Sequence, residues 1–221
     1  MMLNFNSYED LKDKLQIRIY DPDFSRNLLE GKVVTYVGDF ALVYMATLYK
    51  SEKGLGNLMF TPELMDALGI DTQTLHRDAM ISDLNFEPVL FTAEDLIEAL
   101  FFDKPLFSIN LFNRKARMES GQLPMLTLTK GNQMNGASMI LHKGIRKKIG
   151  DIVGGNFYVL PSSIHEVMII PEEGFEAGEL SELVSTCNSE LFTEANSEDI
   201  LSDKVQWCSM DGEILRRAEN E

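Results

Sequence analysis

Two serines, a histidine and a glutamate form the cluster with the clearest chemical potential. Ser162, Ser163, His165 and Glu166 lie within the run PSSIHEV, residues 161–167. Serine, histidine and an acid can form a nucleophilic set when the serine lies on one side of the imidazole and the acid on the other. In a strand, residues two apart share a face and adjacent residues do not, so Glu166 would point away from His165. An acid from elsewhere in the chain would be needed to orient the ring.

The same histidine and glutamate also resemble part of a zinc-protease motif. That motif places a second histidine four residues after the first, on a helix. Here that position is Ile169, and the segment predicts a strand. A three-histidine site would use every histidine of the chain, His76, His142 and His165. We therefore expect no metal site and no catalytic set. The glycines match neither GxGxxG nor the P-loop, so no cofactor is predicted.

We interpret the cluster as an architectural hairpin. Pro161 has no N–H and fixes φ, which suits the end of a strand rather than its middle. Ser162 and Ser163 can bond to backbone groups of the turn. We expect His165 to be partly buried and to donate a hydrogen bond to a backbone carbonyl or to a neighbouring acid.

The elements around this cluster follow from hydrophobic period and turn residues. The pattern predicts strands at Phe157–Leu160 and Ile164–Ile170, joined at residues 161–163. A helix over Leu141–Val153 could lie across that hairpin. Upstream, the composition predicts a strand at Met125–Thr129, a connection with Asn135 and Gly136 in positive φ, and a return strand. The remaining elements expected in this half are the return strand Ala137–Leu141, a helix over Gly178–Leu191 and a strand over Lys204–Ser209.

The first half has a looser pattern. The apolar region Val33–Tyr49 fits a buried strand or a buried helix, and we interpret it as a strand paired with residues 58–60. Thr61 and Pro62 predict one helix start, and Asp71 another. A further helix, Ala93–Phe102, would carry an apolar side made of Leu96, Ile97, Leu100 and Phe101. The fold class is therefore α+β, with antiparallel β-hairpins packed against helices. We expect two β-β-α-like halves, 1–118 and 119–221, or one continuous domain.

Composition and charge limit the classes of partner and the locations that the chain allows. Twenty basic residues against 35 acidic ones give a net charge of −15, which opposes direct binding to nucleic acid. The basic residues at 114–117 (RKAR) are expected to be solvated or to pair with local acids. No apolar run approaches about 20 residues, so no membrane-spanning helix is expected, and the N-terminal residues lack a signal-peptide pattern. Cys187 and Cys208 fit no CxxC spacing. We expect two free, buried thiols in a reducing cytoplasm, with a disulfide left open.

Three longer runs resemble one known family. They are MLTLTKGNQMNGASMILHKGIRKKIG from residue 125, GNFYVLPSSIHEVMIIPEEG from residue 155 and EDILSDKV from residue 198. The matching positions are Thr129, the Asn135-Gly136-Ala137 step, Tyr158–Val167, Leu201-Ser202-Asp203 and Val205. The chain resembles an uncharacterised bacterial family, domain of unknown function 5688, over most of residues 15–215. The resemblance implies no activity, cofactor or catalytic residue.

Three function classes stay open. We favour a non-catalytic cytoplasmic binding or accessory protein with an unidentified protein partner. An acidic protein that blocks a nucleic-acid-binding surface would instead have basic partners, captured less at high salt. An enzyme of unidentified chemistry would need a deep pocket with convergent polar groups.

Overall fold

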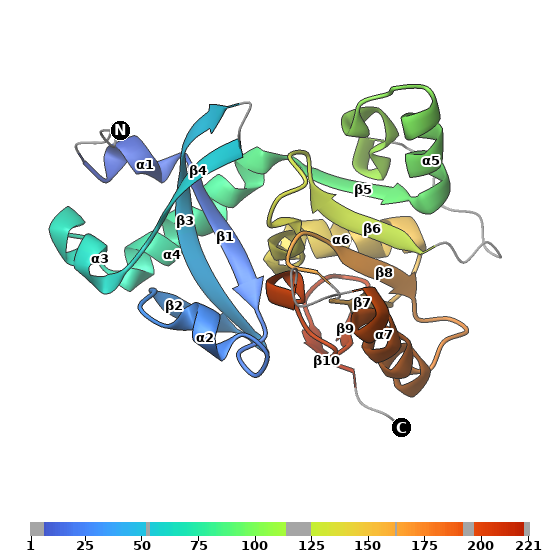
Figure 1. Cartoon of the computed structure of the whole chain (residues 1–221). Coiled ribbons are helices and arrows are strands. Elements are labelled where there is room, and N and C mark those ends of the chain that lie inside the picture. Colours follow the sequence, from blue (N-terminus) through green and yellow to red (C-terminus); the bar gives the residue numbers. More distant parts are fainter. Residues whose placement is uncertain (1–6, 52–53, 114–124, 162, 192–196, 219–221) are drawn as a thin grey trace. The chain divides into compact units, whose positions relative to one another are not determined.

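The chain folds as two compact units, Met1–Phe86 and Glu87–Glu221. The computed structural model describes residues 7–51, 54–113, 125–161, 163–191 and 197–218 (Figure 1). Within these residues the α+β class is confirmed, with one antiparallel sheet in each unit. The division falls after Phe86 rather than between residues 118 and 119, which lie outside the described residues. It falls there because β5 (Pro88–Thr92) pairs with β6 (Leu126–Lys130), which ties residues 87–113 to the second unit.

The sheet of the first unit is organised around one long strand. β3 (Phe40–Ser51) pairs with β1 (Leu15–Tyr20) on one side, and with β2 (Val34–Val37) and then β4 (Gly54–Met59) on the other. The strand interpretation of this apolar region is confirmed, although β2 is a separate strand. Residues 41–46 of β3 are all buried, so both faces of the strand are covered. This explains why the sequence shows a continuous apolar run instead of alternation.

Short helices cover this sheet, and their starts follow the predicted caps. The Thr61 hydroxyl accepts from the Leu64 N–H at 3.3 Å, and the Asp71 carboxylate accepts from the Thr74 N–H at 2.7 Å. The helix after Asp71 packs on β1 and leads to Asp83, whose fully buried carboxylate accepts from the Ile17 N–H at 2.9 Å. Asp83 thereby closes the outer edge of β1. The helical segments of this unit are α1 (Glu9–Lys12), α2 (Arg26–Leu29), α3 (Pro62–Leu68), α4 (Thr72–Ser82) and η1 (Asp83–Phe86).

The second unit holds a sheet in the order β10-β9-β7-β8-β6-β5. Its other strands are β7 (Phe157–Leu160), β8 (Val167–Pro171), β9 (Gln206–Cys208) and β10 (Leu215–Arg217). β6 is paired on both sides, with β5 and with β8, so no edge is left for a return strand. The predicted strand Ala137–Leu141 is therefore wrong. These residues form the 3-10 helix η4 (Gly136–Leu141), and every one of them is buried.

The hairpin expected at residues 157–170 is present with a longer connection. Leu160 pairs with Met168, and β8 begins at Val167 instead of Ile164. Ser163, His165 and Glu166 lie between β7 and β8, in a loop rather than in a strand. The alternation of faces expected for them does not apply.

The remaining helical segments cover the sheet of the second unit. α7 (Ala177–Leu191) packs against β7, with Leu180 and Val184 in one cluster with Tyr158 and Ile170 (Figure 1). α6 packs against η4. None of the helices in the described ranges is long and apolar enough to cross a membrane. The segments not yet placed are α5 (Ala93–Phe101), η2 (Leu106–Ile109), η3 (Leu111–Asn113), α6 (Lys143–Val153) and η5 (Ser197–Asp199).

Candidate functional site

The loop between β7 and β8 is held by the segment around residues 199–202. Ile164 donates its N–H to the Asp199 carbonyl at 2.9 Å, and Ser163 forms an isolated antiparallel bridge with Ile200. The Ser202 N–H donates to the Pro161 carbonyl at 2.9 Å. The PSSIHEV loop and the late EDILSDKV run therefore lie side by side, although they are far apart in the sequence.

The turn between β6 and η4 contacts the same loop from another direction. The Thr129 hydroxyl donates to the His165 carbonyl at 2.9 Å, and the Ala137 N–H donates to the Ile164 carbonyl at 3.3 Å. Asn135 is buried in the left-handed conformation, at φ 54°. A Cβ on Gly136 would lie 2.6 Å from the Lys130 nitrogen and closer still to the His165 carbonyl and the Thr129 hydroxyl. Glycine is required at this position because the backbone approaches leave no space for a side chain.

His165 lies where these segments meet. Its Nδ1 accepts from the Asn135 backbone N–H at 3.2 Å, and its Nε2 lies 3.5 Å from the Asp199 carboxylate. The His165 backbone N–H donates to the Ser163 hydroxyl at 3.0 Å. With Nδ1 accepting, the neutral ring carries its proton on Nε2, toward Asp199. We call Thr129, Asn135, Gly136, Ser163, His165 and Asp199 the His165 junction.

The junction contains a serine, a histidine and an acid, but not in the order that nucleophilic catalysis needs. A catalytic histidine needs one ring nitrogen at the serine hydroxyl and the other at the acid. Here the acid faces Nε2, a backbone amide occupies Nδ1, and the Ser163 hydroxyl accepts from the backbone of His165. Glu166 is exposed, and Ser162 lies outside the described residues. The arrangement joins three chain segments.

The other two histidines lie on different elements. His76 lies on α4, and its Nδ1 forms a hydrogen bond with the Tyr44 hydroxyl at 2.7 Å; the tautomer of the ring decides which atom donates. Tyr44 is fully buried, also bonds to Thr35, and burial raises its pKa to about 12. His142 is buried at the start of α6. Among the described residues, no three histidine, cysteine or acidic side chains are grouped so that they could hold a metal ion.

A buried arginine organises the region of α6. Arg146 donates to the carbonyls of Ile140, Leu141 and Gly212 at 2.8 to 2.9 Å. It therefore caps the last turn of η4, where a positive charge is favourable, and holds the β9–β10 turn on α6. Cys208 is buried nearby, and burial raises the pKa of its thiol to about 11. Cys187 and Cys208 are both free thiols; Cys208 is buried as expected, whereas Cys187 is only partly buried. A thiol with a raised pKa is a poor nucleophile at neutral pH.

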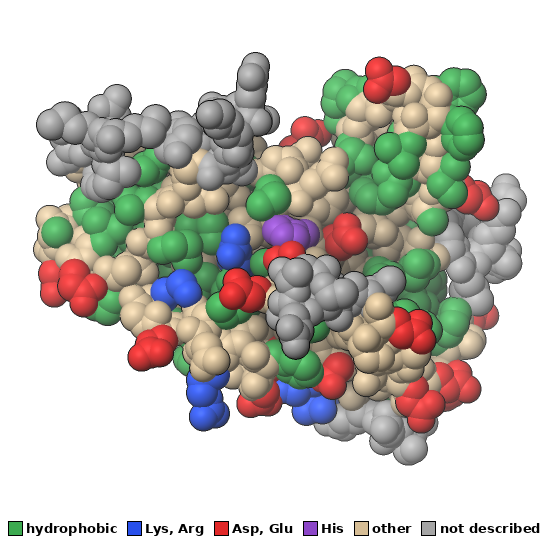
Figure 2. Space-filling view, viewed as in Figure 1, with side chains coloured by type: hydrophobic (Ala, Val, Ile, Leu, Met, Phe, Trp, Pro, Cys, Tyr) green, Lys and Arg blue, Asp and Glu red, His purple; other side chains and the backbone are tan. Residues whose placement is uncertain are grey.

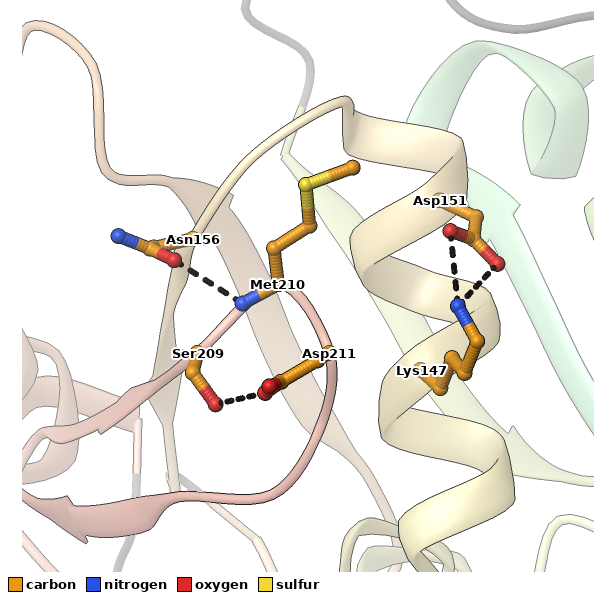
Figure 3. Close-up of a pocket in the computed structure, with 6 residues that line it drawn as sticks. All are labelled: Lys147, Asp151, Asn156, Ser209, Met210 and Asp211. Carbon is orange, nitrogen blue, oxygen red and sulfur yellow. Dashed lines mark hydrogen bonds and ion pairs between the residues drawn. The ribbon is translucent and has the colours of Figure 1, made fainter.

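A pocket of about 290 Å³ opens beside α6 and the β9–β10 turn (Figure 3). Its polar groups already bond to one another or to the adjoining backbone. Lys147 pairs with Asp151 at 3.2 Å, Ser209 donates to Asp211 at 2.6 Å, and Asn156 accepts from the Met210 N–H at 2.9 Å. The close-up shows these as separate pairs around the opening, without a common point toward which they converge. The pocket therefore lacks the convergent polar groups of an active site.

Helix α5 leaves large apolar side chains in solvent. The Thr92 hydroxyl accepts from the Asp95 N–H in a full capping box, so the predicted helix is confirmed. Its inward residues are Leu96 and Ala99, which pack against β5. The other apolar residues of the predicted side point outward: Ile97 is 56% exposed, Leu100 74% and Phe101 83%.

Two phenylalanines that follow in the sequence are also exposed. Phe102 is 68% exposed and Phe107, on η2, 60%. We call Ile97, Leu100, Phe101, Phe102 and Phe107 the α5 face. Figure 2 shows hydrophobic side chains gathered over the lobe that α5 occupies in Figure 1. A periodic apolar helix is normally read as core-facing, so the outward direction of this stripe was not predicted.

The strand beneath this lobe has a closed edge. The Leu90 N–H donates to the Asn110 side-chain oxygen at 3.1 Å, and the Asn110 side-chain amide donates to the Pro88 carbonyl at 2.9 Å. The buried Asn110 thus satisfies two groups on the outer edge of β5, as a neighbouring strand would. The sequence did not indicate the roles of Asn110 and Asp199, nor that Phe102 and Phe107 belong to the exposed apolar surface. Asp199 lies within EDILSDKV, one of the three runs that carry the family resemblance, and nothing else in the sequence indicated its role.

Comparisons with known proteins give one match. Residues 1–208 match a protein family described as "Family of unknown function (DUF5688)". No curated protein and no solved structure matches the chain. The matched region contains the whole His165 junction and the α5 face. Because the match covers nearly the whole chain, the protein belongs to the DUF5688 family of unknown function.

Proposed function

We propose that this protein is a non-catalytic binding protein that recognises a partner protein through the α5 face. One observation carries the proposal: five large apolar side chains, all more than half exposed, come from α5, from its C-cap Phe102 and from η2. Contiguous exposed apolar surface is costly to leave in water and marks interaction sites more often than chance. Aromatic residues are enriched in the cores of protein interfaces, and three of the five are phenylalanines.

The polar clusters of the described residues support binding over catalysis. In the His165 junction, both ring nitrogens of the histidine already face partners. In the pocket beside α6, the polar side chains are bonded to each other or to backbone. An enzyme keeps at least some polar groups directed at the position of a substrate. Neither cluster offers such groups.

Affinity capture with matched variants tests the proposal. Leu100→Ser combined with Phe101→Ser removes two central side chains of the α5 face. The control is Ile81→Ser, because Ile81 is 65% exposed on α4 of the other unit and is remote in sequence from the face. We expect a protein that is captured by the parent and by the control to be lost with the double variant. Equal capture by all three proteins would overturn the proposal, and circular dichroism should first show that all three are folded.

A further inference from the structure

We infer that the partner at the α5 face is a basic amphipathic helix, an inference that rests on the proposed function. The first support is charge. Residues 87–113 hold five carboxylates and one lysine, so the segment stays acidic although Lys104 pairs with Glu98 at 2.7 Å and lies over the Phe102 ring at 5.2 Å. The basic residues at 114–117 lie outside the described residues. Glu94 and Glu98 lie three residues before Ile97 and Phe101 on the helix, so they border the apolar stripe on one side. A partner with lysine or arginine beside its apolar residues would complement this border.

The second support is the shape of the exposed stripe. Ile97, Leu100 and Phe101 are spaced i, i+3 and i+4, which forms a straight ridge along one helix face. Such ridges pack into the grooves of another helix. An extended peptide would instead need an open strand edge, and Asn110 closes the edge of β5 by bonding to Pro88 and Leu90. Strand addition is therefore blocked in this lobe, whereas helix-on-helix packing is open.

The same charges disfavour the other occupants. A second copy of the chain, with its α5 packed antiparallel about a two-fold axis, would bring two acidic borders together. Membrane surfaces that contain anionic lipids would repel a chain of net charge −15. A basic helix from another protein gains from both the apolar ridge and the acidic border.

Three peptides of about 18 residues with one shared apolar stripe test the inference, since that length gives a helix enough turns to form. One carries lysine on its polar face, one glutamine and one glutamate. Binding is measured by fluorescence anisotropy with the full-length protein. We expect the lysine peptide to bind about tenfold more tightly than the glutamate peptide, because its lysines can form border ion pairs that the glutamates replace with repulsion. Raising NaCl from about 50 mM to about 500 mM should weaken the lysine peptide most.

Variants distinguish the inference of a basic helix from the proposal that the α5 face binds a partner at all. Glu94→Gln with Glu98→Gln should remove most of the preference for lysine and leave the glutamine peptide unchanged. Phe101→Ser should weaken all peptides by about 30-fold, as expected for a central aromatic contact. Equal affinity for the three peptides would overturn the basic-helix inference and leave the α5 face as a binding surface.

Other results count against the inference directly. Binding of none of the peptides would overturn it, and the capture experiment would then decide the proposed function alone. Self-association of the parent that Phe101→Ser abolishes, seen by sedimentation, would identify a second copy as the occupant. Phe101-dependent binding to phosphatidylcholine vesicles would identify a lipid surface.

Discussion

The His165 junction and the α5 face depart in opposite directions from what their residue types suggest. In the junction, side chains of catalytic type are bonded to backbone groups of two segments, and His165 also faces the Asp199 carboxylate of a third. On the α5 face, side chains of core type remain in solvent. The difference teaches that residue type alone predicts neither chemistry nor burial. What decides is whether the surrounding backbone has already satisfied the polar group or covered the apolar one.

Substitutions in the two regions should have different effects on the stability of the fold. The junction is a point where the PSSIHEV loop, the β6–η4 turn and the segment around Asp199 depend on one another. Changes there should lower the free energy of unfolding. The α5 face consists of side chains that are more than half exposed, so changes there should affect association and leave folding nearly unchanged.

The largest loss in the free energy of unfolding is expected for Gly136→Ala. The new Cβ would lie 2.6 Å from the Lys130 nitrogen and closer to the His165 carbonyl, so backbone must move. Overpacking against backbone costs about 3 kcal/mol. Gly131→Ala is the matched control, since its nearest neighbours would be Glu87 atoms at 3.7 Å, an ordinary contact. Urea unfolding measures both. If the two variants unfold at the same urea concentration, the junction is not tightly packed.

His165→Ala should cost about 1–3 kcal/mol, because it leaves the Asn135 N–H without the ring acceptor and removes packing. His165→Asn is the control: its side-chain oxygen can take the place of Nδ1 and should restore much of the loss. Thermal unfolding compares both with the parent. A His165→Ala protein as stable as the parent, or more stable, would indicate a strained functional site instead of an architectural one.

Ser163→Ala should cost less, about 1 kcal/mol. It removes the hydroxyl that accepts from the His165 N–H, but Ser163 is only partly buried, so water can replace that acceptor. Urea unfolding of Ser163→Ala beside His165→Ala gives the order. A larger loss for the serine than for the histidine would reverse our account of which side chain holds the loop.

The sequence predicted most elements of the fold because caps and turns act locally. Thr61, Asp71 and Thr92 each start a helix as expected, and the strand at Val33–Tyr49 is present as β2 and β3. The failures concern partners that are distant in the sequence. Ala137–Leu141 has the composition of a strand, but β6 already has a neighbour on each side, and no local pattern reveals this.

The candidate site was predictable only in part, for the same reason. The sequence predicted a structural role for His165, with a backbone carbonyl or a neighbouring acid as its partner, and a distant acid as the group that could orient its ring. It did not indicate that Asp199 is that acid, or that Nδ1 accepts from a backbone amide instead of the ring donating to a carbonyl. The direction of the α5 stripe also escaped prediction. Period 3.6 predicts that apolar residues share a side, but not which side another element covers.

The smallest effect on stability is expected on the α5 face, and it is the sharpest test of the comparison. Phe101→Ala should change the free energy of unfolding by no more than about 0.5 kcal/mol, because the ring is 83% exposed. Leu96→Ala on the same helix is the control and should cost about 2 kcal/mol, since Leu96 packs against the cluster of Val89, Phe91 and Ala99. Urea unfolding at several protein concentrations measures both. A loss near 2 kcal/mol for Phe101→Ala at every concentration would show that the ring is covered within the chain itself. A loss that grows with protein concentration would show that a second copy covers it, because only association makes stability depend on concentration.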